Sequence, residues 1–450
     1  MNDYIEKISL EVNIVGILPT DNYVKAQILI YKEKVLMHIF LSFNDELLLK
    51  INQYKNRDEW SEKILCKNAV LDDKKIKLKL TNSHIVNYGG VIEETINYIW
   101  FQFDYIQYSY KCKIHDNSAK FRLNQEGIKM IQDYYSLCRN NKTEDTIILP
   151  KRADIRAHKI LESTCFPKFI IECVDKKECK DILLEKIPVL EWENISSVES
   201  VIEYNSWICL LASLFYHIDI NYEKGVIYLN GIKTIVRNYT KSQPFLSNNI
   251  LTYFIGLQRI YNFIDNISFV AFNSQKDILK SIIYRYLQSS LLNGATKYIV
   301  LYNIMEQCQQ KSELETFDNL DEIHKAYKQA MDSVKVFVAD NELQDFKNRW
   351  NSVWNFLKQK PYKNSLKDFL KDNNINVNML NNCIIKEFNS EINDYVRLRN
   401  KIAHGSNIKV ADEINNILSF IDLILILNKL DCPIKISNIL KFADIYINTN

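Results

Sequence analysis

Residues 395–405 read Tyr-Val-Arg-Leu-Arg-Asn-Lys-Ile-Ala-His-Gly and predict the end of an amphipathic helix. With an advance of about 100° per residue, Arg399 falls within the apolar side of that helix, next to Tyr395. Gly405 predicts the helix stop, because glycine tolerates the left-handed conformation that closes a helix. The pattern therefore places an arginine on a face that normally packs, with His404 in the final turn.

An arginine on the inward face of a helix has two interpretations. Burying a guanidinium without a partner is strongly unfavourable, so such an arginine forms a structural ion pair or lines a cleft or subunit interface. In the first case His404 is only a cap that favours the helix dipole. In the second, Arg399 suits phosphate binding, and the imidazole of His404 suits proton transfer. Glu306, on an upstream predicted helix, is a candidate partner for Arg399.

Arg399, Asn400 and His404, with three residues between the last two, resemble the R-(N/D/H)-x-x-x-H signature of HEPN ribonucleases. The whole chain is similar to ApeA-type anti-phage proteins, in which a β-rich N-terminal domain precedes an ApeA-like HEPN domain. The N-terminal part of this resemblance is carried by residues 16–19, Gly-Ile-Leu-Pro, and by two β-type runs that follow them.

This resemblance implies a metal-independent endoribonuclease without a cofactor, acting in anti-phage defence by abortive infection. The 2′-hydroxyl of the RNA, with tRNA among the candidate substrates, would attack the adjacent phosphodiester and leave a 2′,3′-cyclic phosphate. Arg399 would align the phosphate and stabilise its charge, His404 would handle protons, and Asn400 would orient the histidine or the phosphate. The resemblance also implies a homodimer with a composite active site, and a phage-derived trigger.

Composition is that of an ordinary globular protein. Hydrophobic residues make up 47% of the 450 residues and charged residues 25%, with a net charge of +2. A net charge this small predicts no broadly basic surface for binding nucleic acid, so any RNA contact requires a local basic cleft. With nine glycines and no phosphate-loop, serine-elbow, zinc-protease or dinucleotide motif, no other catalytic pattern competes.

Cysteine usage and the N-terminus point to the cytoplasm. The ten cysteines form no C-x-x-C pair, which favours free thiols in a reducing compartment. Cys112 and His115 are three residues apart but lack a second pair, so we expect no zinc site. The N-terminus lacks the pattern of a signal peptide, and His217 and Asp422 interrupt the longest apolar stretches. We therefore expect a cytoplasmic protein without membrane contact.

The chain predicts an α+β fold, with a β-rich N-terminal domain over residues 1–245 and an all-α HEPN helical bundle over residues 246–450. Alternating apolar residues predict strands at 8–14, 24–31, 34–43, 96–110 and 166–174. A helix at 196–215 and a hairpin at 225–237, turning at Asn230-Gly231, suggest a second lobe that continues the N-terminal domain.

Three finer expectations follow from local patterns. Gly89 and Gly90 predict a turn before the aromatic run at 98–105, which we interpret as core packing rather than a base-stacking platform. Ser274 with Asp277 predicts a capping box that opens a helix. The helix at 410–430 is apolar on more than one face, so it is central in its domain or packs against a second subunit.

Two alternative functions remain. The first is a non-catalytic RNA-binding HEPN module or toxin partner, in which the same residues hold RNA without cutting it. The second is a CRISPR ancillary HEPN ribonuclease. That class usually needs a parallel α/β sensor, whereas residues 6–112 predict strands without interspersed helices.

Overall fold

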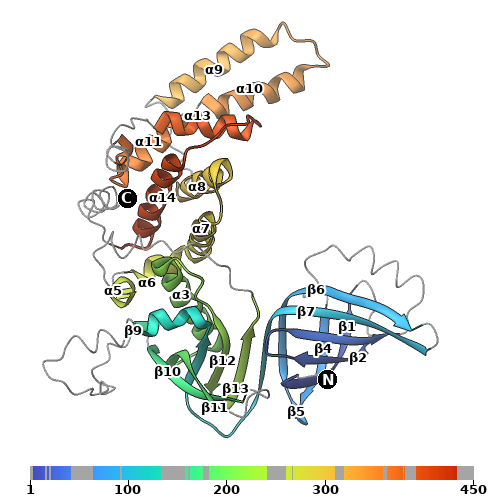
Figure 1. Ribbon diagram of the computed structural model, residues 1–450. Helices are drawn as coiled ribbons and strands as arrows, with labels where there is room; N and C mark the ends of the chain where they lie inside the picture. Colours follow the sequence, from blue (N-terminus) through green and yellow to red (C-terminus); the bar gives the residue numbers. More distant parts are fainter. Residues whose placement is uncertain are drawn as a thin grey trace, which may run out of the picture. The chain divides into compact units, whose positions relative to one another are not determined.

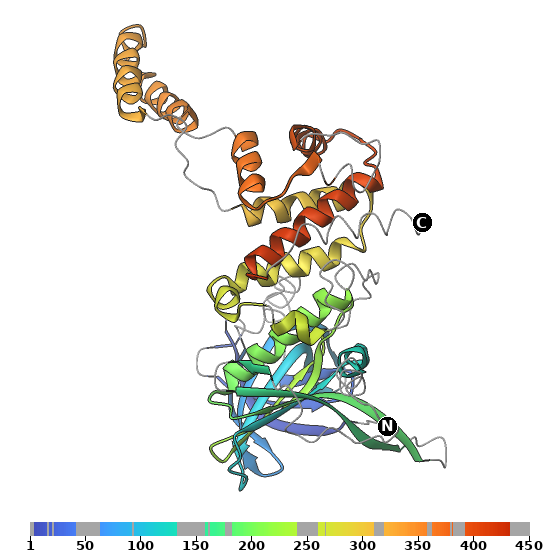
Figure 2. The same ribbon diagram turned by 90° about the vertical axis from the view of Figure 1, so that its left-hand side faces the viewer.

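A computed structural model of the chain describes residues 4–15, 18–19, 22–41, 64–91, 94–132, 158–160, 163–175, 182–240, 260–265, 267–309, 319–357, 362–378, 380 and 392–432. Residues 1–247 and 259–265 form one compact unit, and residues 248–258 and 266–450 form another. The first is β-rich and the second helical, which confirms the predicted α+β class (Figures 1 and 2). The boundary expected after residue 245 lies outside the described residues.

The described residues of the first unit contain one antiparallel sheet of thirteen strands. Their order is β5-β4-β1-β2-β3-β7-β13-β12-β8-β11-β10-β9, and β6 also pairs with β7. The strands are β1 (Glu6–Ile14), β2 (Val24–Ile30), β3 (Val35–Leu41), β4 (Ile64–Leu71), β5 (Lys74–Lys75), β6 (Lys77–Val91), β7 (Glu94–Lys111), β8 (Ser118–Leu123), β9 (His158–Ile160), β10 (Ser163–Asp175), β11 (Ile182–Glu193), β12 (Tyr222–Leu229) and β13 (Ile232–Asn238).

Strand β7, with 18 residues, joins two parts of the sheet. Residues 97–103 of this strand pair with β3, residues 105–111 pair with β13, and β6 follows its other edge. We call β1–β7 the first lobe and β8–β13 the second lobe. The predicted second lobe of the N-terminal domain is therefore part of the same sheet.

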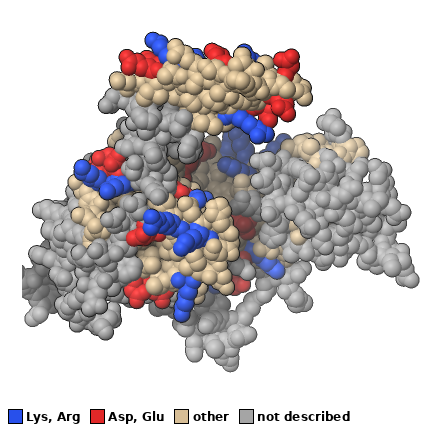
Figure 3. Space-filling model, turned by 90° about the horizontal axis from the view of Figure 1, so that it is seen from above, with Lys and Arg blue, Asp and Glu red and all other residues tan. Residues whose placement is uncertain are grey.

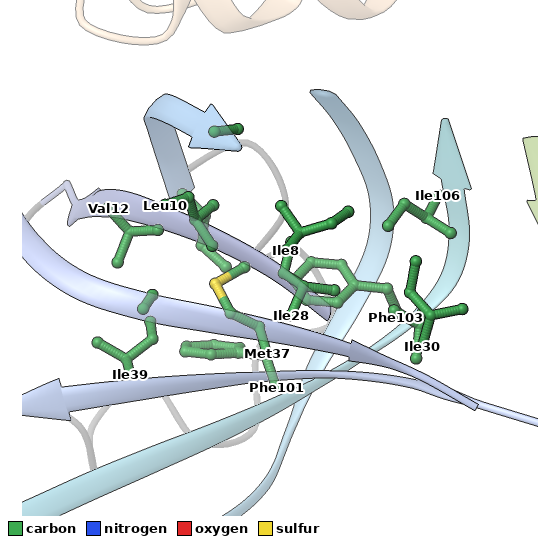
Figure 4. Close-up of a cluster of buried hydrophobic side chains, with 14 of the residues drawn as sticks. Ile8, Leu10, Val12, Ile28, Ile30, Met37, Ile39, Phe101, Phe103 and Ile106 are labelled. Atoms are coloured by element: carbon green, nitrogen blue, oxygen red, sulfur yellow. The ribbon is translucent and has the colours of Figure 1, made fainter. Parts of the chain in front are cut away.

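The first lobe surrounds a hydrophobic core, to which Ile235 of β13 also contributes (Figure 4). Ile8, Met37, Phe101 and Phe103 are all fully buried there. The intervening Trp100 lies on the opposite face of β7 and stacks on His38, with ring centres 4.3 Å apart. The alternation of side chains along a strand thus explains the aromatic run, and Phe101 and Phe103 confirm its interpretation as packing.

The turn predicted at Gly89 and Gly90 is wrong. Both glycines lie in β6, where Gly89 pairs with Tyr98 and Gly90 pairs with Asn97. The strand continues through the glycines because their backbone N–H and C=O groups join the ladder, and it ends only at Val91.

The second lobe packs one face against α3 (Val198–Tyr216). Ser197 caps this helix by accepting a hydrogen bond from the backbone N–H of Ser200 at 3.2 Å. Trp192 Nε1 donates to Asn205 Oδ1 at 3.1 Å, which ties the sheet to the helix. The hairpin of β12 and β13 turns at Asn230-Gly231 as predicted, with positive φ at both residues.

Helices α7 (Lys276–Ser289), α8 (Gly294–Cys308) and α14 (Asp412–Lys429) pack together in the helical unit. The unit also contains α6 (Phe269–Ser274), α9 (Leu320–Lys335), α10 (Leu343–Leu357), α11 (Tyr362–Asp372) and α13 (Ile392–Ala403), whereas α5 (Ile260–Asp265) belongs to the first unit. Within α14, Ile417, Leu418 and Ile421 are completely buried. This helix is therefore central in its own unit, and its apolar surface is no argument for a second subunit. In the described ranges no helix has the length and hydropathy needed to cross a membrane.

The predicted capping box at Ser274 and Asp277 is wrong. Ser274 is the last residue of α6, and its hydroxyl donates to the Ala271 carbonyl at 2.9 Å. Gln275 precedes α7 without a side-chain cap. Ser268 instead caps the short helix α6, which precedes α7, by accepting a hydrogen bond from the backbone N–H of Ala271 at 3.1 Å.

Candidate functional site

Helix α13 carries the candidate site on its second half. Tyr395 and Val396 in its first half are buried, with 2% and 4% of their surface exposed. Arg397 points to solvent and pairs with Asp394 at 3.9 Å, as expected for a surface charge. The side chain of Arg399 is 36% exposed, so it lies at the margin of the packed face.

Helix α8 supplies the surface against which Arg399 lies. Tyr298, Tyr302 and Glu306 recur every four residues and therefore share one side of α8. The Tyr298 hydroxyl donates to the Tyr395 carbonyl at 2.6 Å and fixes α13 to α8. Further along the same row, the guanidinium carbon of Arg399 lies 6.0 Å from the centre of the Tyr302 ring.

Glu306 is the ion-pair partner of Arg399. The distance between Arg399 Nη2 and Glu306 Oε1 is 3.4 Å, which confirms the partner suggested by the sequence. Since Glu306 is 26% exposed and Arg399 36%, water screens the pair, and we expect it to stabilise the fold by about 1 kcal/mol or less. The main effect of the pair is to orient Arg399, because the Glu306 carboxylate and the Tyr302 ring hold its guanidinium near the surface.

Asn400 is exposed and lies beside the guanidinium. Arg399 Nη1 donates to Asn400 Oδ1 at 3.3 Å. The sequence left open whether Asn400 orients the histidine or the phosphate. In the structure its amide oxygen contacts the guanidinium of Arg399. The geometry therefore supports a role for Asn400 in orienting Arg399.

His404 is exposed and forms the C-terminal cap of α13. Its backbone N–H donates to the Asn400 carbonyl at 3.0 Å. The backbone N–H of Gly405 donates to the Ile402 carbonyl, and the backbone N–H of Ser406 donates to the Lys401 carbonyl, both at 3.0 Å. This is the Schellman motif, and Gly405 takes the left-handed position with φ of +81°. The predicted helix stop is thus confirmed, and the imidazole makes no hydrogen bond or ion pair with any described residue.

Gly405→Ala should destabilise the helical unit by about 1 kcal/mol, because an alanine at φ of +81° is strained. No atom of the described residues lies within 4 Å of a Cβ added there, so the cost comes from the backbone. Thermal unfolding should show a melting temperature about 2–4 °C lower. Gly405→Asn should lose less, since asparagine tolerates this conformation. Equal stability of all three proteins would contradict the Schellman assignment.

The structure brings only part of the predicted constellation together. Arg399, Asn400 and Glu306 are in contact, whereas no described contact joins His404 to Arg399. The packed side of α13 also ends before its last residue, because Ala403 is exposed. His404, at the end of α13, is therefore accessible to solvent and does not share a pocket with Arg399 of the same chain.

The described part of the face seen in Figure 3 carries no broad basic surface. Figure 3 shows Lys and Arg side chains interspersed with Asp and Glu on the described part of one face. This agrees with the net charge of +2. Among the described residues no group of three or more His, Cys, Asp or Glu side chains could hold a metal ion.

Tyr298 and Tyr302 were not predicted as parts of the site. Their spacing with Glu306, at positions i, i+4 and i+8 of one helix, is the signal that could have identified them. The fully buried Tyr298 positions the α13 backbone, and Tyr302 lies under the guanidinium. The sequence does not show which of the other helices α13 packs against, and the pairing with α8 is a property of the fold.

No protein-family model matches the sequence, and comparisons with curated proteins and with solved structures find no significant match.

Proposed function

We propose that this protein is a metal-independent HEPN endoribonuclease that acts in anti-phage defence. The observation that carries the proposal is a guanidinium oriented by Glu306 at 3.4 Å, five residues before an accessible histidine at the end of the same helix. A fixed cation and an imidazole that can transfer a proton are what phosphodiester cleavage by an internal 2′-hydroxyl requires.

Arg399 would bind a non-bridging phosphate oxygen and stabilise the charge that develops in the transition state. Its planar donor fork suits this task. The contacts to Glu306 and Asn400 already restrict the Arg399 side chain, so less conformational entropy is lost when the phosphate binds. His404 would accept the proton of the 2′-hydroxyl or donate one to the leaving 5′-oxygen. The bond to the 5′-oxygen breaks as the bond to the 2′-oxygen forms, which leaves a cyclic phosphate and a 5′-hydroxyl.

A second copy of the chain would complete the site. Within one chain the described residues show no contact between Arg399 and His404, so a composite site would combine these groups from two copies. Both groups reach the surface, with Arg399 36% exposed. This homodimer, the cytoplasmic location, RNA or tRNA as substrate and a phage-derived trigger rest on the resemblance of the whole chain to ApeA-type proteins.

The ion pair with Glu306 also favours a second candidate, an HEPN module that binds RNA without cutting it. The carboxylate offsets the charge that Arg399 would direct at a phosphate, and no described residue fixes the tautomer of His404. Such a module would retain RNA binding and show no cleavage at any protein concentration.

Cleavage is tested by incubating the purified protein with total RNA in EDTA, beside His404→Ala. His115→Ala is the matched control, because His115 is also exposed but lies in the first unit. The native protein and the control should degrade RNA, and His404→Ala should be slower by about 100-fold or more. Equal degradation by all three would contradict the assignment of His404. If no protein cleaves RNA even with extract from phage-infected cells, the proposed ribonuclease is wrong.

A further inference from the structure

A second feature of the molecule lies on the second lobe of the sheet, on the face opposite α3. The face toward α3 is apolar, with Ala119, Phe121 and Trp192 fully buried. Because side chains alternate along each strand, the residues between these point the other way. On β8 those residues are Lys120 and Arg122, so the second face carries charge where the first carries the core.

The strand register aligns further cationic residues with these two. Lys224 of β12 pairs with Arg122, and Val189 of β11 lies between Arg122 and Lys168 of β10. In a neighbouring row Tyr228 of β12 pairs with Lys233 of β13. We call this set the basic face: Lys120, Arg122, Lys168, Lys224, Tyr228 and Lys233.

The cationic groups are accessible. The side chain of Lys120 is 52% exposed, that of Lys168 is 35% exposed and that of Arg122 is 30% exposed. Lys224 and Lys233 are half-buried. Their stems pack on the sheet, while their charged ends can reach a ligand in solvent.

Carboxylates on the same face do not cancel the positive charge. Lys120 and Lys168 share one ion-pair partner, Glu191, and the distance from Lys120 Nζ to Glu191 Oε1 is 3.2 Å. Burial acts to raise the pKa of Glu191, but the hydrogen bonds and charges of Lys168 and Lys120 outweigh it and lower the pKa. One anion therefore serves two cations. Glu193 and Glu223 add two further carboxylates, and Glu223 pairs with Arg122 at 3.4 Å. The five cationic side chains of the basic face therefore exceed these three carboxylates by two.

Aromatic rings accompany the charges. Lys233 Nζ lies 5.8 Å from the ring centres of both Tyr228 and Tyr110. Both rings are half-buried, so the sheet holds them in place while part of each ring faces solvent. Rings held among lysines at the surface of a sheet are suited to stack unpaired bases while the cations contact the backbone.

We propose that the basic face binds single-stranded nucleic acid, with its cations on phosphates and Tyr228 stacked on a base. A duplex fits less well, because its bases are stacked internally and are not free to cover a tyrosine. This inference goes beyond the proposed function, since it concerns the first unit and does not require that any RNA be cut.

Binding is measured by fluorescence anisotropy with full-length His404→Ala, so that RNA stays intact even if the native protein cleaves it. The probes are labelled 12-nucleotide oligouridine, oligothymidine of equal length and an RNA duplex. We expect Lys120→Gln/Lys224→Gln/Lys233→Gln to weaken single-strand binding about 10-fold or more, and to reduce the salt slope by about 2. Tyr228→Ala should weaken it about 5- to 150-fold.

The control variant is Lys325→Gln/Lys328→Gln/Lys371→Gln, which removes equal charge from exposed positions of the helical unit. It should bind within about 2-fold of the parent. Melting curves show whether each variant is folded, and the single change Lys120→Gln replaces the triple variant if that does not fold. Oligouridine preferred over oligothymidine identifies RNA as the ligand, and equal binding identifies single strands of both kinds. Absent binding, equal losses in both triple variants, or tighter duplex binding would overturn the proposal.

Discussion

Arg399→Ala should lower the rate of RNA cleavage by about 100-fold or more and leave the protein folded. The guanidinium is the only permanent cation among the predicted site residues Arg399, Asn400 and His404, so its removal eliminates the stabilisation of the phosphate charge. The fold should survive, because the screened pair with Glu306 contributes about 1 kcal/mol or less. Single-turnover rates and thermal melting of the same samples test both statements.

The matched control is Arg397→Ala. Arg397 lies on the same helix, but its side chain is 70% exposed and pairs with Asp394. We expect a cleavage rate within about 2-fold of the native protein. Arg399→Lys should fall between the two, since lysine keeps the charge and loses the planar fork. If Arg399→Ala unfolds the protein, the arginine is a structural ion pair. If Arg399→Ala and Arg397→Ala lose equal activity, the loss reflects the removal of one positive charge and no specific role of Arg399.

Asp422→Asn should stabilise the protein at neutral and alkaline pH. Asp422 is completely buried within α14, and neither carboxyl oxygen has a hydrogen-bond partner among the described residues. Burial raises the pKa of Asp422 well above its usual range. The nearby Tyr286 and Cys308 are also buried, and burial raises the pKa of each to about 12, so neither offers a charge near pH 7.

The direction of the pH effect follows from the raised pKa. The folded protein holds a proton that the unfolded chain releases above about pH 4, so native stability is lost as the pH rises. Relative to Asp422→Asn, the native protein should lose about 1.4 kcal/mol per pH unit until the folded pKa is reached. Urea unfolding between pH 5 and pH 8 measures this difference.

Asp431→Asn is the control for that experiment, because Asp431 is exposed just after α14. Its pH dependence should follow that of the native protein. If Asp422→Asn follows it as well, Asp422 does not hold its proton in the folded state, and the buried carboxyl has a partner.

Local patterns predicted the parts of the candidate site that depend on one helix. The positive φ of Gly405 follows from chain chirality. Helical periodicity placed Arg399 within the apolar side of its helix, whereas its side chain is 36% exposed and lies at the margin of that side. The strand ends were also predicted closely, as for 24–31 against Val24–Ile30. These features depend on residues within a few positions of each other, so the sequence shows them directly.

Features that join distant segments could not be predicted. Pairing of β7 with β3 and β13 links residues far apart in the chain, and a periodicity of two does not identify the partner strand. The alternatives for the helix at 410–430 predict the same apolar pattern, and only packing with α7 and α8 shows that it is central. Tyr302 likewise joins the site through the packing of α8 against α13.

The chemical identity of the RNA ends tests the central claim most directly. Total RNA is incubated in EDTA with the native protein or with His404→Ala, and the 3′ ends are mapped with and without enzymatic removal of cyclic phosphate. The proposed mechanism predicts 2′,3′-cyclic phosphates at new ends that arise with the native protein alone. New ends that carry a 3′-hydroxyl, or identical ends from both proteins, would contradict cleavage by the 2′-hydroxyl with His404 as the proton-transfer group.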